Sequence, residues 1–172
     1  ACNYVVAACW EFIIPGRAMD IPNIAALSFT RAVTEAVEQK LEECETWEDF
    51  YGQVRERIRA QAGELCGQVE NLYVFPAPFL SLMMEGCAEN AWDISLGSRY
   101  NNYGFHGTGI ATAADSLAAV KKFVFEEKSV DASTLKKALS CNFEGFEELG
   151  NRLRYEAPKM GNNDDYVDGI AC

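Results

Sequence analysis

Residues 101–128 read NNYGFHGTGIATAADSLAAVKKFVFEEK, a glycine-rich beginning followed by a long stretch without glycine or proline. The glycines at 104, 107 and 109 alternate with aromatic and polar residues, which predicts a tight turn with positive φ angles or close backbone approach. Asp115 is then predicted to cap a helix over residues 116–128. The pattern therefore predicts a glycine turn that leads into a strong helix.

The glycines of this stretch do not match a phosphate-binding loop. GFHGTG, residues 104–109, has neither the G-x-G-x-x-G spacing of dinucleotide-binding loops nor the G-K-[ST] sequence of a P-loop. A structural turn is the favoured interpretation. His106, the sole histidine, is either a general base or a loop histidine that meets a backbone partner, and the second role is more common.

The flanking segments predict both strands and helices. Strands are predicted over residues 1–14 and 71–76, with a turn at residues 20–23. Helical spacing of apolar residues predicts further helices over residues 24–43, 46–66, 78–90, 133–140 and 143–156. Thr46 is predicted to cap the second of these helices, with Asp49 three residues later.

Charge and composition exclude several classes of function. The chain has 172 residues and a formal net charge of −11, which disfavours nucleic acid and anionic membrane surfaces as partners. Its hydrophobic content of 49% is enough for a packed core. The sequence contains no run of about 18 apolar residues, the length that a membrane-spanning helix needs. The charged run at residues 55–59 is interpreted as a solvated helix face.

The cysteines argue against a disulfide framework and against zinc. There are seven of them, an odd number, and no pair has C-x-x-C spacing. Zinc sites usually need clustered cysteine and histidine ligands, and the chain has only one histidine. No directly bound metal is therefore expected. Reduced thiols in a cytoplasmic, anaerobic setting are the simplest interpretation.

A second polar stretch, GNNDDYVD at residues 161–168, contains three aspartates. It lacks the alternating acidic positions and the final glutamate of an EF-hand, so calcium binding is not predicted. These side chains are expected to cap backbone groups in a turn.

The triplet Cys9-Trp10-Glu11 places a thiol and a carboxylate two residues apart. On a strand both side chains point to the same face, and in a tight loop they also meet. A thiol can act as nucleophile, metal ligand or radical carrier, and a carboxylate can transfer protons. The competing interpretation is a buried, inert cysteine beside a paired glutamate.

Three stretches together resemble the glycyl radical enzymes, the relatives of pyruvate formate-lyase. Residues 101–128 resemble the family's glycine-rich segment and following helix, PKMGNNDDYVD at 158–168 resembles its GNDDDYVD-type turn, and Cys9-Trp10-Glu11 resembles its G-C-x-E motif. The resemblance implies that residues 1–172 are a helix-rich α/β fragment of a ten-stranded barrel. They would form part of a single catalytic domain, without the family's N-terminal half and C-terminal R-V-x-G-Y-type glycyl radical loop.

The resemblance implies roles for two residues. Cys9 corresponds to the cysteine that becomes a thiyl radical, and Glu11 to the acid/base of the dehydratase and lyase branch. The full-length protein would be a homodimer acting on a small-molecule substrate. Its glycyl radical would be installed by a separate activating enzyme that uses S-adenosylmethionine and an iron–sulfur cluster, with no metal held by these residues.

Departures from the family pattern leave alternatives open. Ala8 replaces the usual glycine, so the double cysteine of 2-keto acid cleavage is absent, and Trp10 replaces a small aliphatic residue. Elimination of water or another leaving group is the first interpretation. Trp10 and the apolar residues 12–14 also suit an arylacetate decarboxylase. A third interpretation is that the isolated chain is a non-catalytic fragment or a partner-binding piece.

Overall fold

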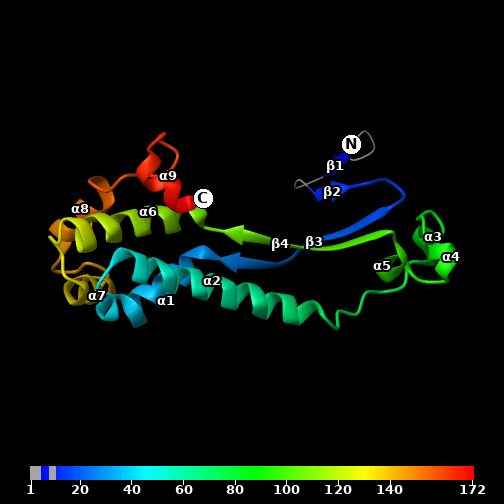
Figure 1. Cartoon of the computed structure of the whole chain (residues 1–172), viewed down its shortest axis with the longest axis horizontal. Helices are drawn as coiled ribbons and strands as arrows, with labels where there is room; N and C mark the ends of the chain where they lie inside the picture. Colours follow the sequence, from blue (N-terminus) through cyan, green and yellow to red (C-terminus); the bar gives the residue numbers. More distant parts are fainter. Residues whose placement is uncertain (1–4, 8–10) are drawn as a thin grey trace. The chain divides into compact units, whose positions relative to one another are not determined.

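The computed structural model describes residues 5–7 and 11–172, although the side chains at 6, 7, 11, 12 and 21–23 lie outside the description. The described chain is a mixture of strands and helices, as predicted (Figure 1). It divides into two compact units. Unit 1 contains residues 1–26 and 64–106, and unit 2 contains residues 27–63 and 107–172.

Unit 1 begins with a β-hairpin where the sequence predicted one strand. Strands β1 (Val5–Ala7) and β2 (Glu11–Ile13) pair in antiparallel register, with Val5 opposite Ile13 and Ala7 opposite Glu11. The prediction of one strand over residues 1–14 was therefore wrong in its topology. A continuous apolar pattern does not reveal where a strand reverses direction. The predicted loop at Pro15-Gly16 is confirmed as a turn.

Strands β3 (Ala18–Ser28) and β4 (Tyr100–Thr108) form a separate two-stranded sheet. The Arg17 carbonyl accepts from the Tyr100 amide at 3.0 Å, and the Leu27 carbonyl accepts from the Thr108 hydroxyl at 3.3 Å. Both segments therefore advance in the same direction, as their arrows do in Figure 1. The predicted turn at residues 20–23 was wrong, because a strand can include a proline where its missing N–H is not needed for pairing.

The glycine-rich beginning of residues 101–128 is a strand, so the predicted tight turn was also wrong. Only its last glycine needs a left-handed backbone: Gly109 has φ +74° and precedes helix α6 (Ile110–Val120). Gly107 meets a different requirement, since a Cβ there would lie 2.3 Å from Cε2 of Phe29. Close packing against an aromatic ring, rather than chain reversal, explains this glycine.

Helix α6 starts earlier than predicted, so Asp115 lies inside the helix and is not its cap. Its carboxylate accepts instead from the Met160 amide at 2.8 Å. The helix continues into a π-helical segment, η2 (Lys121–Glu126). Asp115 therefore fixes the polar segment around residue 160 to α6.

Three further helices precede α6 in the sequence of unit 2. They are α1 (Phe29–Lys40), the short 3₁₀ helix η1 (Leu41–Glu43) and α2 (Trp47–Val69). Ser28 caps α1 by accepting from the Arg31 amide at 3.2 Å, so this helix begins five residues later than predicted. The cap at Thr46 is confirmed, because its hydroxyl accepts from the Asp49 amide at 3.1 Å.

The remaining helices are short. Unit 1 holds α3 (Pro78–Ser81), α4 (Cys87–Asn90) and α5 (Ile94–Gly97). Unit 2 holds α7 (Ala132–Ser140), α8 (Glu147–Tyr155) and α9 (Asp165–Ala171). The predicted strand at 71–76 was wrong, and the predicted helix at 78–90 is interrupted by turns. None of the helices in residues 5–7 and 11–172 has the length and apolar composition to cross a bilayer.

The core of unit 2 lies between α1, α2, α6 and η2. Phe50 and Phe123 are fully buried there, and the Phe50 ring lies 5.8 Å from that of Phe125. Glu56 and Arg59 of α2 are exposed, which confirms the interpretation of a solvated face for these two residues, whereas Arg57 is half-buried. Apolar burial on one side of α2 is what fixes this unit.

Replacing Phe50 by alanine should destabilise unit 2 by about 3–5 kcal/mol, because a fully buried ring would leave a cavity. Native-state hydrogen exchange of α2 and α6 amides in the full-length protein measures this loss. Tyr155→Ala is the matched control. That ring is 74% exposed, so its removal should change stability by no more than about 0.5 kcal/mol. Equal exchange in the two variants would contradict this assignment of the core.

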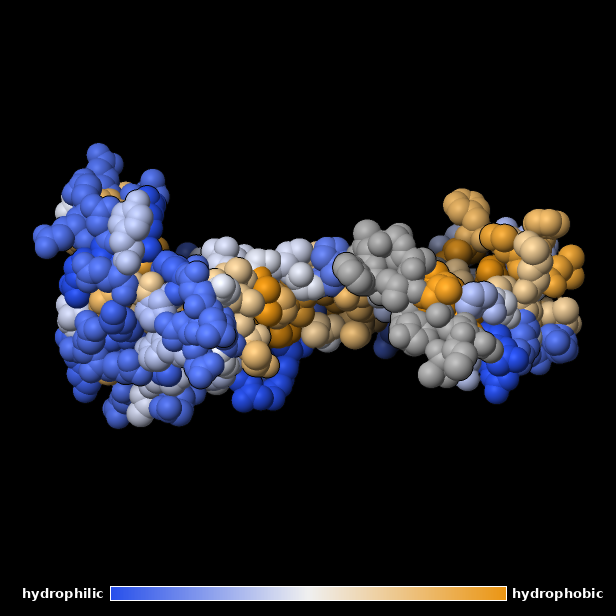
Figure 2. Space-filling view, turned by 90° about the horizontal axis from the view of Figure 1, so that it is seen from above, coloured by the Kyte–Doolittle hydropathy of each residue, from blue (hydrophilic) through white to orange (hydrophobic). Residues whose placement is uncertain are grey.

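Unit 1 exposes a set of large apolar side chains around α3, α4 and α5. In Figure 2 the orange of hydrophobic residues is gathered over these helices. The side chains that are at least 60% exposed are Tyr73, Phe75, Phe79, Leu82, Trp92 and Leu96. Apolar patches of this kind are rare on isolated monomeric proteins and usually mark a surface that contacts other protein.

Candidate active site

The hairpin of unit 1 carries the predicted catalytic pair. β1 ends at Ala7 and β2 begins at Glu11, so residues 8–10 connect the two strands and Cys9 is the middle one. Cys9 itself lies outside the described residues. Glu11 is the first residue of β2, and its backbone is opposite Ala7, while its side chain lies outside the description. The described strands therefore end at Ala7, two residues before Cys9, and resume at Glu11, the last residue of the motif.

A tight turn follows the hairpin and connects β2 to β3. The Ile14 carbonyl accepts from the amides of Arg17 and Ala18, both at 2.9 Å. Gly16 has φ +73°, a backbone conformation that glycine adopts without steric cost. Ala18 is buried, so the turn leads directly into a packed position at the start of β3.

A carboxylate from another part of unit 1 contacts this turn. Glu85 forms ion pairs with Arg17 at 2.6 Å and with Arg99 at 2.7 Å, using a different oxygen for each. Its backbone amide also donates to the Gly16 carbonyl at 2.7 Å. The hydrogen bond from Arg99, together with the charge of Arg17, lowers the pKa of Glu85 below its ordinary value.

Sequence reasoning missed this group of three charged residues. They are separated by 68 and 14 positions, and no local spacing joins them. The available signal was weak: Glu85 precedes Gly86, and Arg99 follows Gly97, two glycines at tight backbone approaches.

Two of the three aspartates at residues 161–168 act as backbone caps, as predicted. Asp164 accepts from the Tyr166 amide at 3.0 Å and caps α9, while Asp168 accepts from the Gly161 amide at 3.1 Å. In the part of the chain that the structure describes, no group of three or more potential metal ligands forms a cluster. This segment lies in unit 2, whereas the Cys9-x-Glu11 hairpin lies in unit 1.

An aromatic and charged contact holds the same segment against η2. The Tyr166 hydroxyl donates to Glu126 at 2.8 Å, and the Lys121 ammonium lies 4.3 Å from the centre of the Tyr166 ring. Burial, followed by the bond to Glu126, raises the pKa of Tyr166 above its ordinary value. Tyr166 therefore remains a hydrogen-bond donor and has a structural role.

His106 does not take the role expected for it. It lies on β4, exposed, and its side chain has no hydrogen bond among the described residues. The expected backbone partner is therefore not observed. An exposed imidazole on a strand, without an orienting partner, offers little as a general base.

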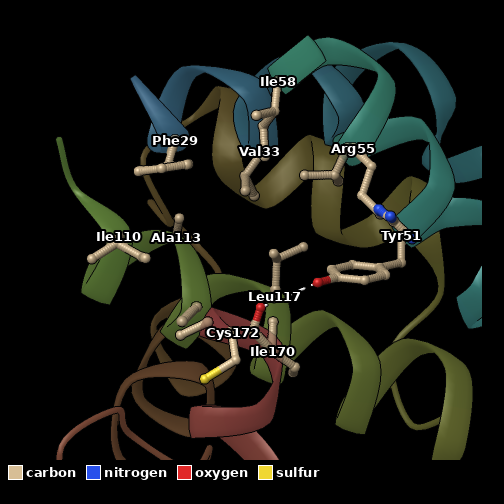
Figure 3. Close-up of a pocket in the computed structure, with 13 residues that line it drawn as sticks. Phe29, Val33, Tyr51, Arg55, Ile58, Ile110, Ala113, Leu117, Ile170 and Cys172 are labelled. Carbon is tan, nitrogen blue, oxygen red and sulfur yellow. Dashed lines mark hydrogen bonds between the residues drawn. The ribbon is translucent and has the colours of Figure 1, made fainter. Parts of the chain in front are cut away.

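Unit 2 contains a cavity of about 180 Å³. Its walls are almost entirely apolar and come from α1, α2, α6 and α9, as Figure 3 shows. Among the described residues that line it, Arg55 alone is charged, and the Tyr51 hydroxyl donates to the Ile170 carbonyl at 3.2 Å. Without convergent polar groups, the cavity is a packing feature rather than a catalytic site.

Comparison with known proteins identifies the family. The family model described as pyruvate formate lyase-like matches residues 1–172. The chain belongs to this family. Trans-4-hydroxy-L-proline dehydratase of Clostridioides difficile is 43% identical over 105 residues, which are 59% of this chain and 13% of that enzyme. Isethionate sulfite-lyase of Nitratidesulfovibrio vulgaris is 31% identical over 195 residues, 99% of this chain and 23% of that enzyme.

Solved structures of pyruvate formate-lyase-like proteins agree with this assignment. The glycerol-bound B12-independent glycerol dehydratase from Clostridium butyricum is 29% identical, with a TM-score of 0.89, over 98% of this chain and 24% of that one. Hydroxyproline dehydratase from Clostridioides difficile, with its substrate bound, is 25% identical with a TM-score of 0.77 and the same coverage. The chain thus spans about a quarter of the length of these relatives.

These comparisons confirm two predictions. The chain is a mixed α/β segment of the pyruvate formate-lyase-like glycyl radical enzymes, and it belongs to their dehydratase and lyase branch. Both solved structures hold a small polar molecule, glycerol in the first and trans-4-hydroxy-L-proline in the second.

Proposed function

We propose that residues 1–172 are part of the single catalytic domain of a glycyl radical dehydratase or lyase. In this proposal Cys9 removes a hydrogen atom from the substrate and Glu11 transfers protons. The observation that carries it is the Cys9-x-Glu11 spacing within a hairpin, in a chain matched along its whole length by the family model.

The proposed chemistry begins with hydrogen transfer between sulfur and carbon. The Cys9 thiyl takes a hydrogen atom from a substrate carbon that bears a hydroxyl group, which leaves a thiol and a carbon radical. This exchange is feasible because S–H and activated C–H bonds have similar strength. The carbon radical makes its own hydroxyl proton far more acidic, so the Glu11 carboxylate can accept that proton.

Loss of the leaving group completes the reaction. The C–O bond on the neighbouring carbon breaks, and Glu11 returns its proton to the departing hydroxide, which leaves as water. The resulting carbonyl-bearing radical takes the hydrogen atom back from the Cys9 thiol. The thiyl is thereby restored, and neither an oxidant nor a reductant is consumed. Other leaving groups on that carbon follow the same sequence. In trans-4-hydroxy-L-proline the ring N–H takes the place of the first hydroxyl group, so the product is an imine.

The family's glycyl radical would supply the initial oxidation of the Cys9 thiol. Its glycine is expected in an R-V-x-G-Y-type loop that does not occur in residues 1–172. We further propose activation by an S-adenosylmethionine and iron–sulfur enzyme, a homodimeric full-length protein and a cytoplasmic location. Seven cysteines, five of which are free in the described part of the chain, suit a reducing compartment.

A substrate panel with the activated full-length enzyme tests the reaction type. We expect elimination from at least one of glycerol, 1,2-propanediol, trans-4-hydroxy-L-proline and isethionate, measured as the aldehyde, imine or sulfite product. Indoleacetate serves as the competing substrate. Decarboxylation of indoleacetate without elimination from the other four would overturn the dehydratase and lyase assignment, as would no turnover of any of them.

The arylacetate decarboxylase remains the second candidate because of one group of residues. Trp10 and the apolar residues 12–14 follow the cysteine where a site for an aromatic substrate would benefit from apolar side chains. Indoleacetate decarboxylase of Tractidigestivibacter scatoligenes is 30% identical over 122 residues, 56% of this chain and 14% of that enzyme. Both candidates use a Cys-x-Glu pair, so product analysis separates them.

The isolated 172-residue chain is a different case, because it lacks the R-V-x-G-Y-type sequence. We expect no glycyl radical signal from this chain by EPR after incubation with an activating enzyme. A glycyl radical signal would contradict the proposal that the chain functions only as part of a longer protein.

A further inference from the structure

The Cys9-x-Glu11 hairpin is connected to β3 by a turn whose residues belong to neither apolar core cluster of the described chain. Arg17 is about half exposed, and the turn is closed by the two hydrogen bonds to the Ile14 carbonyl. A short hairpin in water is only marginally stable without further contacts. The position of Glu11 therefore depends on what holds residues 14–18.

The segment that holds this turn is itself well fixed. Asp93 accepts from the Ala77 amide at 2.7 Å and from the Ser81 hydroxyl at 3.0 Å, which joins the first and last parts of residues 77–98. These bonds, first that from Ala77, lower the pKa of Asp93, so it stays ionised at neutral pH. Cys87 is buried at the centre, only 1% exposed.

Two glycines bring the chain of this segment into close contact with itself. A Cβ at Gly86 would lie 2.7 Å from the Gly97 carbonyl oxygen, and a Cβ at Gly97 would lie 2.8 Å from the Trp92 carbonyl oxygen. Neither position tolerates a side chain without movement of the backbone. Residues 77–98 are therefore a compact support, with Glu85 beside its tightest point.

Glu85 connects this support to the turn by two contacts and to the start of β4 by a third. Its amide donates to the Gly16 carbonyl, one carboxylate oxygen pairs with Arg17, and the other pairs with Arg99 at the start of β4. A single exposed ion pair contributes little, but a carboxylate shared by two arginines restricts three segments at once. The Tyr100 amide adds a bond to the Arg17 carbonyl, so Arg17 is held at both its side chain and its backbone.

We propose that Glu85 is a positioning residue for the reaction: it holds the turn that sets the orientation of the Cys9-x-Glu11 hairpin. This inference rests on the proposed function. Glu85 acts through Arg17 and the turn at residues 14–18, five residues beyond Cys9. A small displacement of reacting groups lowers the rate of a chemical step far more than it lowers substrate affinity.

Glu85→Gln in the full-length activated enzyme is the test, since it keeps the size of the side chain and removes its charge. We expect kcat per glycyl radical, counted by EPR, to fall by about 10–100-fold with KM changed less than twofold. Counting per radical removes any contribution from a misfolded fraction. Hydrogen exchange of the peptide over residues 11–18 should also rise.

Matched variants separate positioning from a general effect of charge. Glu70→Gln removes the charge of an exposed glutamate in unit 1 that has no ion pair among the described residues, and should leave kcat per radical unchanged. Arg17→Gln should resemble Glu85→Gln, whereas Arg17→Lys should restore most of the rate. Wild-type kcat per radical in Glu85→Gln, or unchanged exchange over residues 11–18, would overturn the inference.

A Cys9→Ala variant measured in parallel keeps this result distinct from the proposed function. If Cys9→Ala retains turnover, the proposed function fails whatever Glu85 does. If Cys9→Ala is inactive while Glu85→Gln is fully active, only the positioning role fails.

Discussion

Turnover is expected to vanish in the Cys9→Ala variant of the full-length enzyme, while its glycyl radical still forms. Alanine has no S–H bond, so no group at this position can remove a hydrogen atom from the substrate. The radical itself is installed elsewhere, on a glycine outside residues 1–172 in this proposal, and so it should not depend on Cys9. EPR spin counting and product analysis on the same sample measure both properties.

The control for this variant is Cys66→Ala. Cys66 lies exposed on α2, where alanine is a good helix former, so its loss should change neither turnover nor radical content. Any turnover above background in Cys9→Ala would refute the thiyl role. Loss of the EPR signal together with turnover would show that Cys9 also serves activation, which this proposal does not include.

Features governed by local spacing could be predicted from the sequence. The Thr46 cap and the buried side of α2 depend on residues three or four positions apart, and both are present. The aspartate caps at 164 and 168 are likewise local, since each binds a backbone amide within seven residues. Family membership was predicted from two long motifs. The amino-acid composition alone could not have predicted it.

Features that depend on distant partners could not be predicted in the same way. Residues 20–23 contain turn-forming types, yet pairing with β4, 80 residues away, makes them part of a strand. Gly107 suggested a turn, but its requirement comes from the Phe29 ring. The ion pairs of Glu85 could not be predicted for the same reason, because only the fold brings Arg17 and Arg99 to it.

The second large expected effect is the loss of turnover when Glu11, the proposed proton carrier, is replaced. Glu11→Gln should lower kcat by about 10²–10⁴-fold, the usual contribution of a general acid or base, because an amide cannot accept the hydroxyl proton. The glycyl radical and the thiol of Cys9 remain in this variant. Glu64→Gln is the matched control, since Glu64 is an exposed residue of α2 and should keep wild-type kcat.

Deuterium incorporation into the substrate distinguishes the loss of turnover in Glu11→Gln from that in Cys9→Ala. In D₂O the thiol that forms by hydrogen abstraction exchanges the substrate's hydrogen for deuterium while the blocked substrate radical persists. A Glu11→Gln enzyme should still remove a hydrogen atom from the substrate and return a deuterium atom. Recovered substrate should therefore carry deuterium at the reacting carbon with Glu11→Gln and none with Cys9→Ala, as mass spectrometry would show. Undeuterated substrate from Glu11→Gln would mean that Glu11 is needed before hydrogen abstraction, which contradicts its role as the proton acceptor of the substrate radical.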